Sequence, residues 1–199
     1  MGRKRREASP TGVYHWIVRG MNRRKLFHQS EDYKQFSDLM RQHQDNYQIS
    51  IYHYCLMNNH VHLLLRADTL ENLSGFSHFV QRRYAYYICG KYKWNGSVFR
   101  QGYRSLPIDR DEYLLECGRY IERNPIAAGI VSKPEDYGYS SYRFYAFGYP
   151  DSLLTSSPAF EGLATRLDER RALYAAHVNA ARVQEEMFAK GLLPALEKV

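Results

Sequence analysis

Hydrophobic and polar residues form three short patterns that are typical of β-strands. These patterns cover residues 13–18, 49–57 and 59–66. Successive side chains of a strand point to opposite faces, so His60 and His62 share one face while Val61 and Leu63 share the other. The second and third strands are joined by a short connection at Asn58, which predicts an antiparallel hairpin. The apolar face is expected in a core, and the histidine face is then held on a rigid element.

Apolar residues spaced three and four apart predict three helices. We expect them over residues 30–46, over residues 70–91, and from Asp109 or Asp111 to about Asn124. Asp109 and Glu112 have the spacing of a capping box, with Asp in place of the usual Ser or Thr. Pro125 predicts the end of the third helix, because proline disfavours the helical conformation in the residue before it. Residues 95–108 are expected to form a loop and a short strand.

The third predicted helix has two adjoining stripes. Leu114 and Ile121 form an apolar seam, and Tyr120 and Asn124 lie one turn apart along its edge, in a stripe that also holds Tyr113 and Cys117. Tyr120 and Asn124 are therefore neighbours beside the core.

The chain divides into three parts by composition. Residues 1–10 read as a basic flexible arm, residues 11–149 as one domain, and residues 150–199 as a helical C-terminal extension. The extension has apolar residues at helical spacing at Leu163, Leu167, Tyr174, Val178, Ala181 and Phe188. This pattern favours a helix packed on the domain over a regulatory or partner-binding role.

Charge favours a polyanionic partner. The chain has 28 Lys and Arg against 21 Asp and Glu, a formal net charge of +7, and 18 tyrosines. Basic residues interleaved with aromatic ones suit a surface that neutralises phosphates and stacks on unpaired bases. The three cysteines are far apart and form no C-x-x-C pair, which argues against a disulfide framework or a cysteine zinc site. Neither a signal peptide nor an apolar run long enough to span a membrane is present, so we expect a cytoplasmic protein.

Several basic residues are candidate DNA contacts. A loop dense in positive charge beside Gly20 is the strongest candidate, because a glycine at a strand end permits close approach to a phosphate; a solvated turn is the alternative. The candidates in this loop are Arg19, Arg23, Arg24 and Lys25. Further candidates are Arg82 and Arg83, with a solvated helix face as the alternative, and the arm residues Arg3, Lys4, Arg5 and Arg6, with a solvated tail as the alternative. Arg100 and Arg104, on either side of Gly102, are candidates as well.

His60 and His62 are spaced so that both imidazoles can converge on one cation or one phosphate. Two ligands do not complete a metal site. We hypothesise that Asn124 supplies a third ligand and Tyr120 a nucleophile, which suits Mg²⁺ or Mn²⁺ with open positions for phosphate oxygens; the ligands alone do not exclude zinc. Spacing does not by itself select Tyr120 among the 18 tyrosines.

Two motifs, in this order, resemble the REP-associated branch of the HUH single-tyrosine transposases. They are MNNHVHLLL at residues 57–65 and YIERNPIAAGIV at residues 120–131. Supporting stretches are YHWIVRG at 14–20, VFRQG at 98–102 and YGYSSY at 137–142. The resemblance covers about residues 12–148. It implies that His60 and His62 bind a metal, that Tyr120 attacks the DNA, and that Asn124 is a polar metal ligand.

The resemblance also implies a fold and a substrate. The fold is an α+β ferredoxin-like sandwich, with a central antiparallel sheet that carries the histidines and the tyrosine helix laid across it. The implied partner is single-stranded DNA beside a palindromic hairpin, cleaved to a 5′-phosphotyrosine with a divalent metal, Mg²⁺ or Mn²⁺. Asn58 stands where the family often has proline, which alters the turn before the histidines and removes no ligand. Monomer and homodimer both stay open.

Two alternatives compete with this interpretation. A histidine-triad nucleotide hydrolase would begin with a similar His60-Val61-His62-Leu63 run, but Leu64 stands where its next histidine should be. A nucleic-acid-binding module with structural histidines would bind hairpin DNA without forming an adduct.

Overall fold

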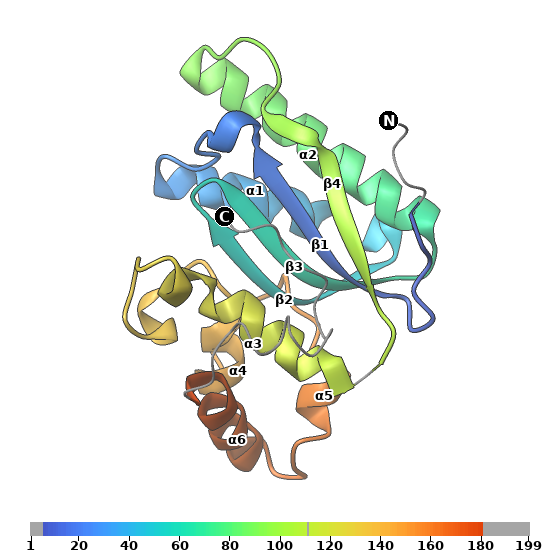
Figure 1. Ribbon diagram of the computed structural model, residues 1–199, viewed down its shortest axis with the longest axis vertical. Helices are drawn as coiled ribbons and strands as arrows, with labels where there is room; N and C mark the ends of the chain where they lie inside the picture. The colour runs from blue at the N-terminus through green and yellow to red at the C-terminus, as the bar shows by residue number, and fades with distance from the viewer. Residues whose placement is uncertain (1–5, 111, 181–199) are drawn as a thin grey trace.

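A four-stranded antiparallel sheet organises the protein (Figure 1). A computed structural model describes residues 6–110 and 112–180. The strands lie in the order β2-β3-β1-β4. Their bounds are β1 Val13–Gly20, β2 Ile49–Met57, β3 His60–Ala67 and β4 Phe99–Ile108. The two central strands are thus β1 and β3, and β3 carries the His60 and His62 pair.

Helices cover both faces of the sheet, and their order along the chain produces the ferredoxin-like arrangement (Figure 1). Helices α1 (Ser30–His43) and α2 (Leu70–Tyr92) pack on one face, and α3 (Glu112–Ala127) lies across the other, against β2 and β3. The α+β sandwich predicted from the sequence is therefore confirmed. The remaining elements are η1 Met21–Arg23, η2 Asp45–Tyr47, η3 Pro134–Asp136, α4 Tyr142–Phe147, α5 Pro158–Glu161 and α6 Leu167–Asn179.

The alternation of side chains along the central strands separates two cores. Trp16, Val61 and Leu63 point toward α1 and α2, where they are fully or almost fully buried in the larger apolar cluster. Leu64 and the neighbouring apolar residues of the opposite face pack under Leu114 and Ile121 of α3. The polar side of β3 is consequently buried too, beneath a helix rather than in solvent.

Edge strand β2 is covered by chain from later in the sequence. The backbone N–H of Leu56 donates to the carbonyl of Tyr139, at 2.9 Å, and that of Ser141 donates to Tyr54, at 3.0 Å. Farther along the strand, Thr155 N–H donates to Ile51 at 2.9 Å. These bonds satisfy backbone groups that an open edge would leave available for pairing with another chain.

The C-terminal helices share one apolar cluster. Tyr145 of α4, Phe160 of α5 and Tyr174 of α6 are buried against one another. This cluster joins the two sides of the boundary that we expected near residue 150. Ala181 and Phe188 of the predicted pattern lie outside the described residues. No helix in the described part of the chain is both long and apolar enough to cross a bilayer.

The sequence-based bounds needed two corrections. Residues 95–98 form the predicted loop, but the strand that follows is ten residues long rather than short: β4 tolerates Pro107 because it is an edge strand. The predicted stop of the third helix near Asn124 was wrong, since α3 continues through Pro125 to Ala127. The side-chain amide of Asn124 donates to the carbonyls of Tyr120 (2.9 Å) and Ile121 (3.3 Å). In a regular helix the Ile121 carbonyl would accept from the backbone N–H of residue 125, which proline lacks. The Asn124 amide supplies the missing donor.

A buried carboxylate ties α1 to α2. Asp32 is fully buried and accepts hydrogen bonds from Lys91 Nζ (2.7 Å), Tyr87 Oη (2.8 Å), Tyr92 Oη (2.8 Å) and the backbone N–H of His28 (2.8 Å). Burial alone would raise the pKa of Asp32, but these donors, led by the Lys91 ammonium, hold its pKa well below the usual range. The carboxylate is therefore ionised and contributes to stability through its charge.

We expect Asp32→Asn to lower the free energy of unfolding by about 2–4 kcal/mol, because donors arranged around a carboxylate are left poorly matched. Since the folded-state pKa is depressed, the stabilisation by Asp32 is complete above about pH 5 and is lost as pH falls. Denaturant unfolding should thus give a smaller difference in unfolding free energy between the wild type and Asp32→Asn at pH 3 than at pH 7. Asp38→Asn on the same helix, which removes ion pairs with Lys34 and Arg41, is the control and should cost less than about 1 kcal/mol. Equal losses in both variants would contradict this interpretation of Asp32.

Candidate active site

Three histidines meet on the sheet face beneath α3. His60 and His62 project from β3, and their rings lie 4.9 Å apart in an edge-on arrangement. His15 projects from β1 onto the same face, and its Nε2 lies 2.9 Å from His62 Nδ1. The sequence analysis did not select His15. The alternation of side chains along β1 places His15 and Arg19 on one face and could have been seen in the sequence. The register that pairs β1 with β3, and so brings His15 to His62, could not.

The hydrogen bonds of the two β3 histidines leave their Nε2 atoms available. His60 Nδ1 lies 2.6 Å from the amide oxygen of Asn59, which only accepts, so Nδ1 carries the proton and Nε2 carries a lone pair. His62 Nδ1 is occupied by His15. Both Nε2 atoms are buried and have no hydrogen-bond partner among the described residues.

A divalent cation fits this pair of nitrogens, because each ring is held by its other nitrogen as metal-binding histidines usually are. In the described part of the chain, no group of three or more His, Cys, Asp and Glu side chains could hold a metal ion. Further ligands would have to be of another type, such as a side-chain amide, or come from the substrate.

All three histidines are neutral at pH 7. Burial, and then the charge of Arg19, lowers the pKa of His60 to about 4. Burial, and then the charge of Arg104, lowers the pKa of His15 to about 3. The pKa of His62 lies well below its ordinary value for the same reason, with His60 adding to the effect. Neutral imidazoles are the form that binds metal ions.

Tyr120 of α3 packs directly onto these rings. Its ring centroid lies 5.8 Å from that of His62 and 5.8 Å from that of His15, both nearly perpendicular. Burial raises the pKa of the phenol well above its ordinary value, and Cys117 adds to the effect. Arg19 and a hydrogen-bonding contact with the Asn124 side chain oppose that rise. The phenol is therefore protonated in the free protein, with one positive charge placed to favour its ionised form.

Two of the predicted DNA-contacting arginines border this site. Arg19 pairs with His60 in the register of β1 and β3, and Arg104 of β4 pairs with Ile17 on the histidine face. Both are close enough to lower histidine pKa values.

The basic loop after β1 is fixed to the histidine end of the sheet. Gly20 N–H donates to the carbonyl of Asn59 at 2.8 Å, and Leu26 N–H donates to that of Asn58 at 2.7 Å. A Cβ at Gly20 would collide with the backbone of Arg24, so only glycine permits this tight loop. The loop side chains Arg23, Arg24 and Lys25 are exposed.

An aromatic group that the sequence analysis did not select adjoins this loop. The Arg24 guanidinium lies 4.5 Å from the ring centroid of Trp94, and the exposed His28 ring contacts Trp94 (5.5 Å) and Tyr92 (4.7 Å). We call Arg24, His28, Tyr92 and Trp94 the basic-aromatic shelf.

The remaining predicted DNA contacts are dispersed. Arg82 and Arg83 are exposed on α2, which covers the other face of the sheet, so the structure does not bring them to the histidine site. Arg100 is exposed on β4, and Arg6 lies 4.0 Å over the ring of Tyr103. Arg3, Lys4 and Arg5 lie outside the described residues.

One family model matches more than half of this chain, and two solved structures were found by comparison of the fold. Residues 9–124 match the family model described as IS200-like transposase. A REP-associated tyrosine transposase solved bound to a REP hairpin is similar in fold, with a TM-score of 0.63, 17% identity, and coverage of 78% of this chain and 92% of that chain. A protein of Deinococcus radiodurans R1, provisionally described as a transposase, gives a TM-score of 0.41 at 20% identity over 62% and 95% of the two chains. No curated protein matches.

We expect nitrogen NMR spectra of the metal-free protein at pH 7 to identify His60 as a neutral ring protonated on Nδ1, because Asn59 accepts from that atom. Asn59→Ala should let His60 sample both tautomers, and the exposed His78 ring serves as a reference in the same spectra. A charged His60 ring, or a proton fixed on its Nε2, would contradict the ligand geometry described above.

Proposed function

We propose that this protein, which belongs to the IS200-like transposase family, is a single-stranded DNA endonuclease and strand transferase that acts beside DNA hairpins. The observation that carries the proposal is the packing of Tyr120 against His62 and His15, with Arg19 alongside. The fold shared with a transposase solved bound to a REP hairpin supports a hairpin as the DNA partner.

The proposed metal is Mg²⁺ or Mn²⁺, held by Nε2 of His60 and His62 with the Asn124 amide oxygen as a third ligand. When bound, such an ion would neutralise the charge of the scissile phosphate and orient it. The single amide nitrogen of Asn124, Nδ2, donates to the carbonyls of Tyr120 and Ile121, so the amide oxygen is the atom that could bind a cation. The imidazole pair also suits zinc, so the identity of the ion is part of the test.

Tyr120 is the proposed nucleophile. Its Oη would attack the phosphorus of the scissile phosphodiester, forming a phenolic P–O bond while the bond to the 3′-oxygen breaks. The phenol loses its proton, the released 3′-oxygen gains one, and the DNA 5′-phosphate stays on the protein. Because the new ester keeps the bond energy, a second 3′-hydroxyl can reverse the step and complete strand transfer without ATP. The positive charge of Arg19 favours the phenolate that this attack requires.

The DNA path that we propose runs from this site over the basic loop. Arg19 and Arg104 would contact the phosphates next to the cleaved bond, and Arg23, Arg24 and Lys25 would follow the strand outward. The basic-aromatic shelf would stack on an unpaired base there. Arg82, Arg83, Arg100, Arg6 and the arm residues Arg3, Lys4 and Arg5 stay sequence-based predictions of DNA contacts.

We expect Tyr120→Phe to abolish the covalent adduct, with at least a 1,000-fold loss in rate, and to leave hairpin affinity within about twofold, because only the attacking oxygen is removed. The assay is a denaturing gel after incubation with hairpin-bearing single-stranded DNA and Mg²⁺, Mn²⁺ or Zn²⁺ separately. Tyr113→Phe, on the same helix, is the matched control and should react at the wild-type rate. Tight hairpin binding by the wild-type protein with no adduct under any ion would identify a binding module instead.

We expect Arg24→Ala combined with Trp94→Ala to weaken hairpin binding by about 10- to 100-fold, through loss of one phosphate contact and one stacked base. The slope of log affinity against log salt should become shallower by nearly one unit in Arg24→Ala alone and stay constant in Trp94→Ala alone. Fluorescence anisotropy over a salt series measures both. Arg166→Ala, an exposed arginine in the C-terminal extension, is the control. Wild-type affinity and slope in the double variant would remove the loop from the DNA path.

A further inference from the structure

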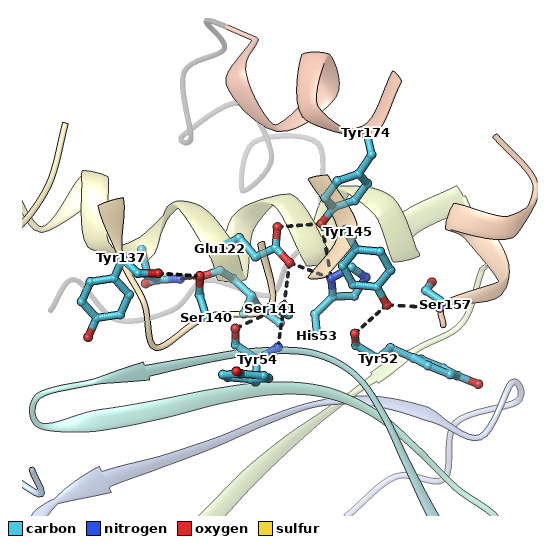
Figure 2. Close-up of polar contacts among 12 residues, drawn as sticks. Tyr52, His53, Tyr54, Glu122, Tyr137, Ser140, Ser141, Tyr145, Ser157 and Tyr174 are labelled. Atoms are coloured by element: carbon cyan, nitrogen blue, oxygen red, sulfur yellow. Dashed lines mark hydrogen bonds and ion pairs between the residues drawn. The ribbon is translucent and has the colours of Figure 1, made fainter. Parts of the chain in front are cut away.

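A buried polar network connects the C-terminal extension to the helix that carries Tyr120 (Figure 2). Glu122, two residues after Tyr120 on α3, is fully buried. Its Oε1 accepts from Ser141 Oγ (2.6 Å) and lies 3.1 Å from His53 Nδ1 of β2. Its Oε2 accepts from the Tyr174 hydroxyl of α6 at 2.7 Å. One carboxylate thus joins α3, β2, the chain before α4, and α6.

A second set of bonds joins α3 to the end of α6. Arg119, fully buried on α3, donates from Nε to the carbonyl of His177 (3.1 Å) and from Nη2 to that of Ala180 (2.7 Å). Arg123, one turn later, donates from Nη1 to the carbonyl of Val178 at 2.9 Å. The last carbonyls of a helix have no partners within the helix and carry its negative end. Two arginines of α3 therefore cap α6.

The depth of α3 on the sheet is fixed at the same point. A Cβ at Gly118 would lie 2.8 Å from the ring atoms Cε1 and Nε2 of His53, so α3 approaches β2 this closely only because residue 118 is glycine. His53 cannot easily move aside, since its ring is held by Glu122 and stacks on Tyr145 of α4 at 4.5 Å (Figure 2).

These contacts give α3 two faces with different partners. Tyr120 faces the histidine site, while Arg119, Glu122 and Arg123 form hydrogen bonds with α6. We propose that α6 is a positioning element for the catalytic helix. Tyr174, together with Glu122, Arg119 and Arg123, sets the rotation and height of α3 so that the Tyr120 oxygen is aimed at the phosphate. The role of Tyr120 rests on the function proposed above; the restraint of α3 by α6 does not.

The chemistry of the network explains why it serves positioning rather than packing. An apolar contact would bury the same surface with little directional preference, whereas a buried carboxylate with donors from three elements is satisfied in one arrangement only. Misplacing a reacting group by about 1 Å can cost on the order of 100-fold in rate. A small rotation of α3 is therefore expected to reduce cleavage before it reduces DNA binding, because the basic loop lies on a different element.

Tyr174→Phe removes the hydroxyl and keeps the ring. We expect single-turnover adduct formation to slow at least tenfold, hairpin affinity to stay within twofold, and hydrogen exchange of the α3 amides to increase at least tenfold. Tyr142→Phe is the matched control: it also removes a buried hydroxyl bonded to α6, at Asn179 Nδ2 (2.9 Å), but that bond leads to α4 instead of α3. It should leave the cleavage rate and the α3 exchange within twofold of the wild type.

A second variant tests the proposal in case Tyr174→Phe does not fold. Arg123→Met removes a cap of α6 from a half-buried position and should show the same split between cleavage and binding. Unchanged hydrogen exchange of the α3 amides in both Tyr174→Phe and Arg123→Met would overturn the proposal. The proposal would also fail if Tyr142→Phe changed cleavage and α3 exchange as much as Tyr174→Phe does. If the wild-type protein forms no adduct, the proposed nuclease function fails, and the exchange measurement still decides whether α6 restrains α3.

Discussion

The contact of α3 with the histidine face of the sheet is the interaction on which the rest of the protein depends. Leu114 and Ile121 provide the apolar surface that buries this face, and Tyr120 is brought onto His62 and His15 by the same packing. Burial then makes the histidines neutral and the phenol protonated, which are the starting states of the proposed metal binding and the proposed attack. Fold and chemistry are therefore set by one helix-on-sheet interface.

That interface is assembled from polar groups that would be costly to bury singly. His60 bonds to Asn59, His62 bonds to His15, and Glu122 receives two hydroxyl donors beside His53. The Nε2 atoms of His60 and His62 are buried without hydrogen-bond partners among the described residues, and so are His15 Nδ1 and His53 Nε2. Buried polar groups without partners are often explained by a catalytic role or by a bound ion or water.

Local patterns predicted much of this fold, because strand alternation and helical spacing are properties of neighbouring residues. The shared face of His60 and His62, and the adjacency of Tyr120 and Asn124, follow from such patterns. The bond between His15 and His62, and the one between His53 and Glu122, join residues 47 and 69 positions apart and require strand register and helix placement that no local pattern contains. The helix end predicted from Pro125 was wrong for a related reason. The side chain of Asn124 donates to the Ile121 carbonyl in place of the N–H that proline lacks, so the helix continues.

The proposed function requires that Tyr120 is the residue that becomes linked to DNA. It is tested most directly by digesting the protein after reaction with hairpin-bearing single-stranded DNA and a divalent metal, and locating the modified residue by tandem mass spectrometry. We expect a nucleotide 5′-phosphate on Tyr120 and a free 3′-hydroxyl on the released strand. A phosphate on any other tyrosine, or cleaved DNA with no modified residue, would contradict it.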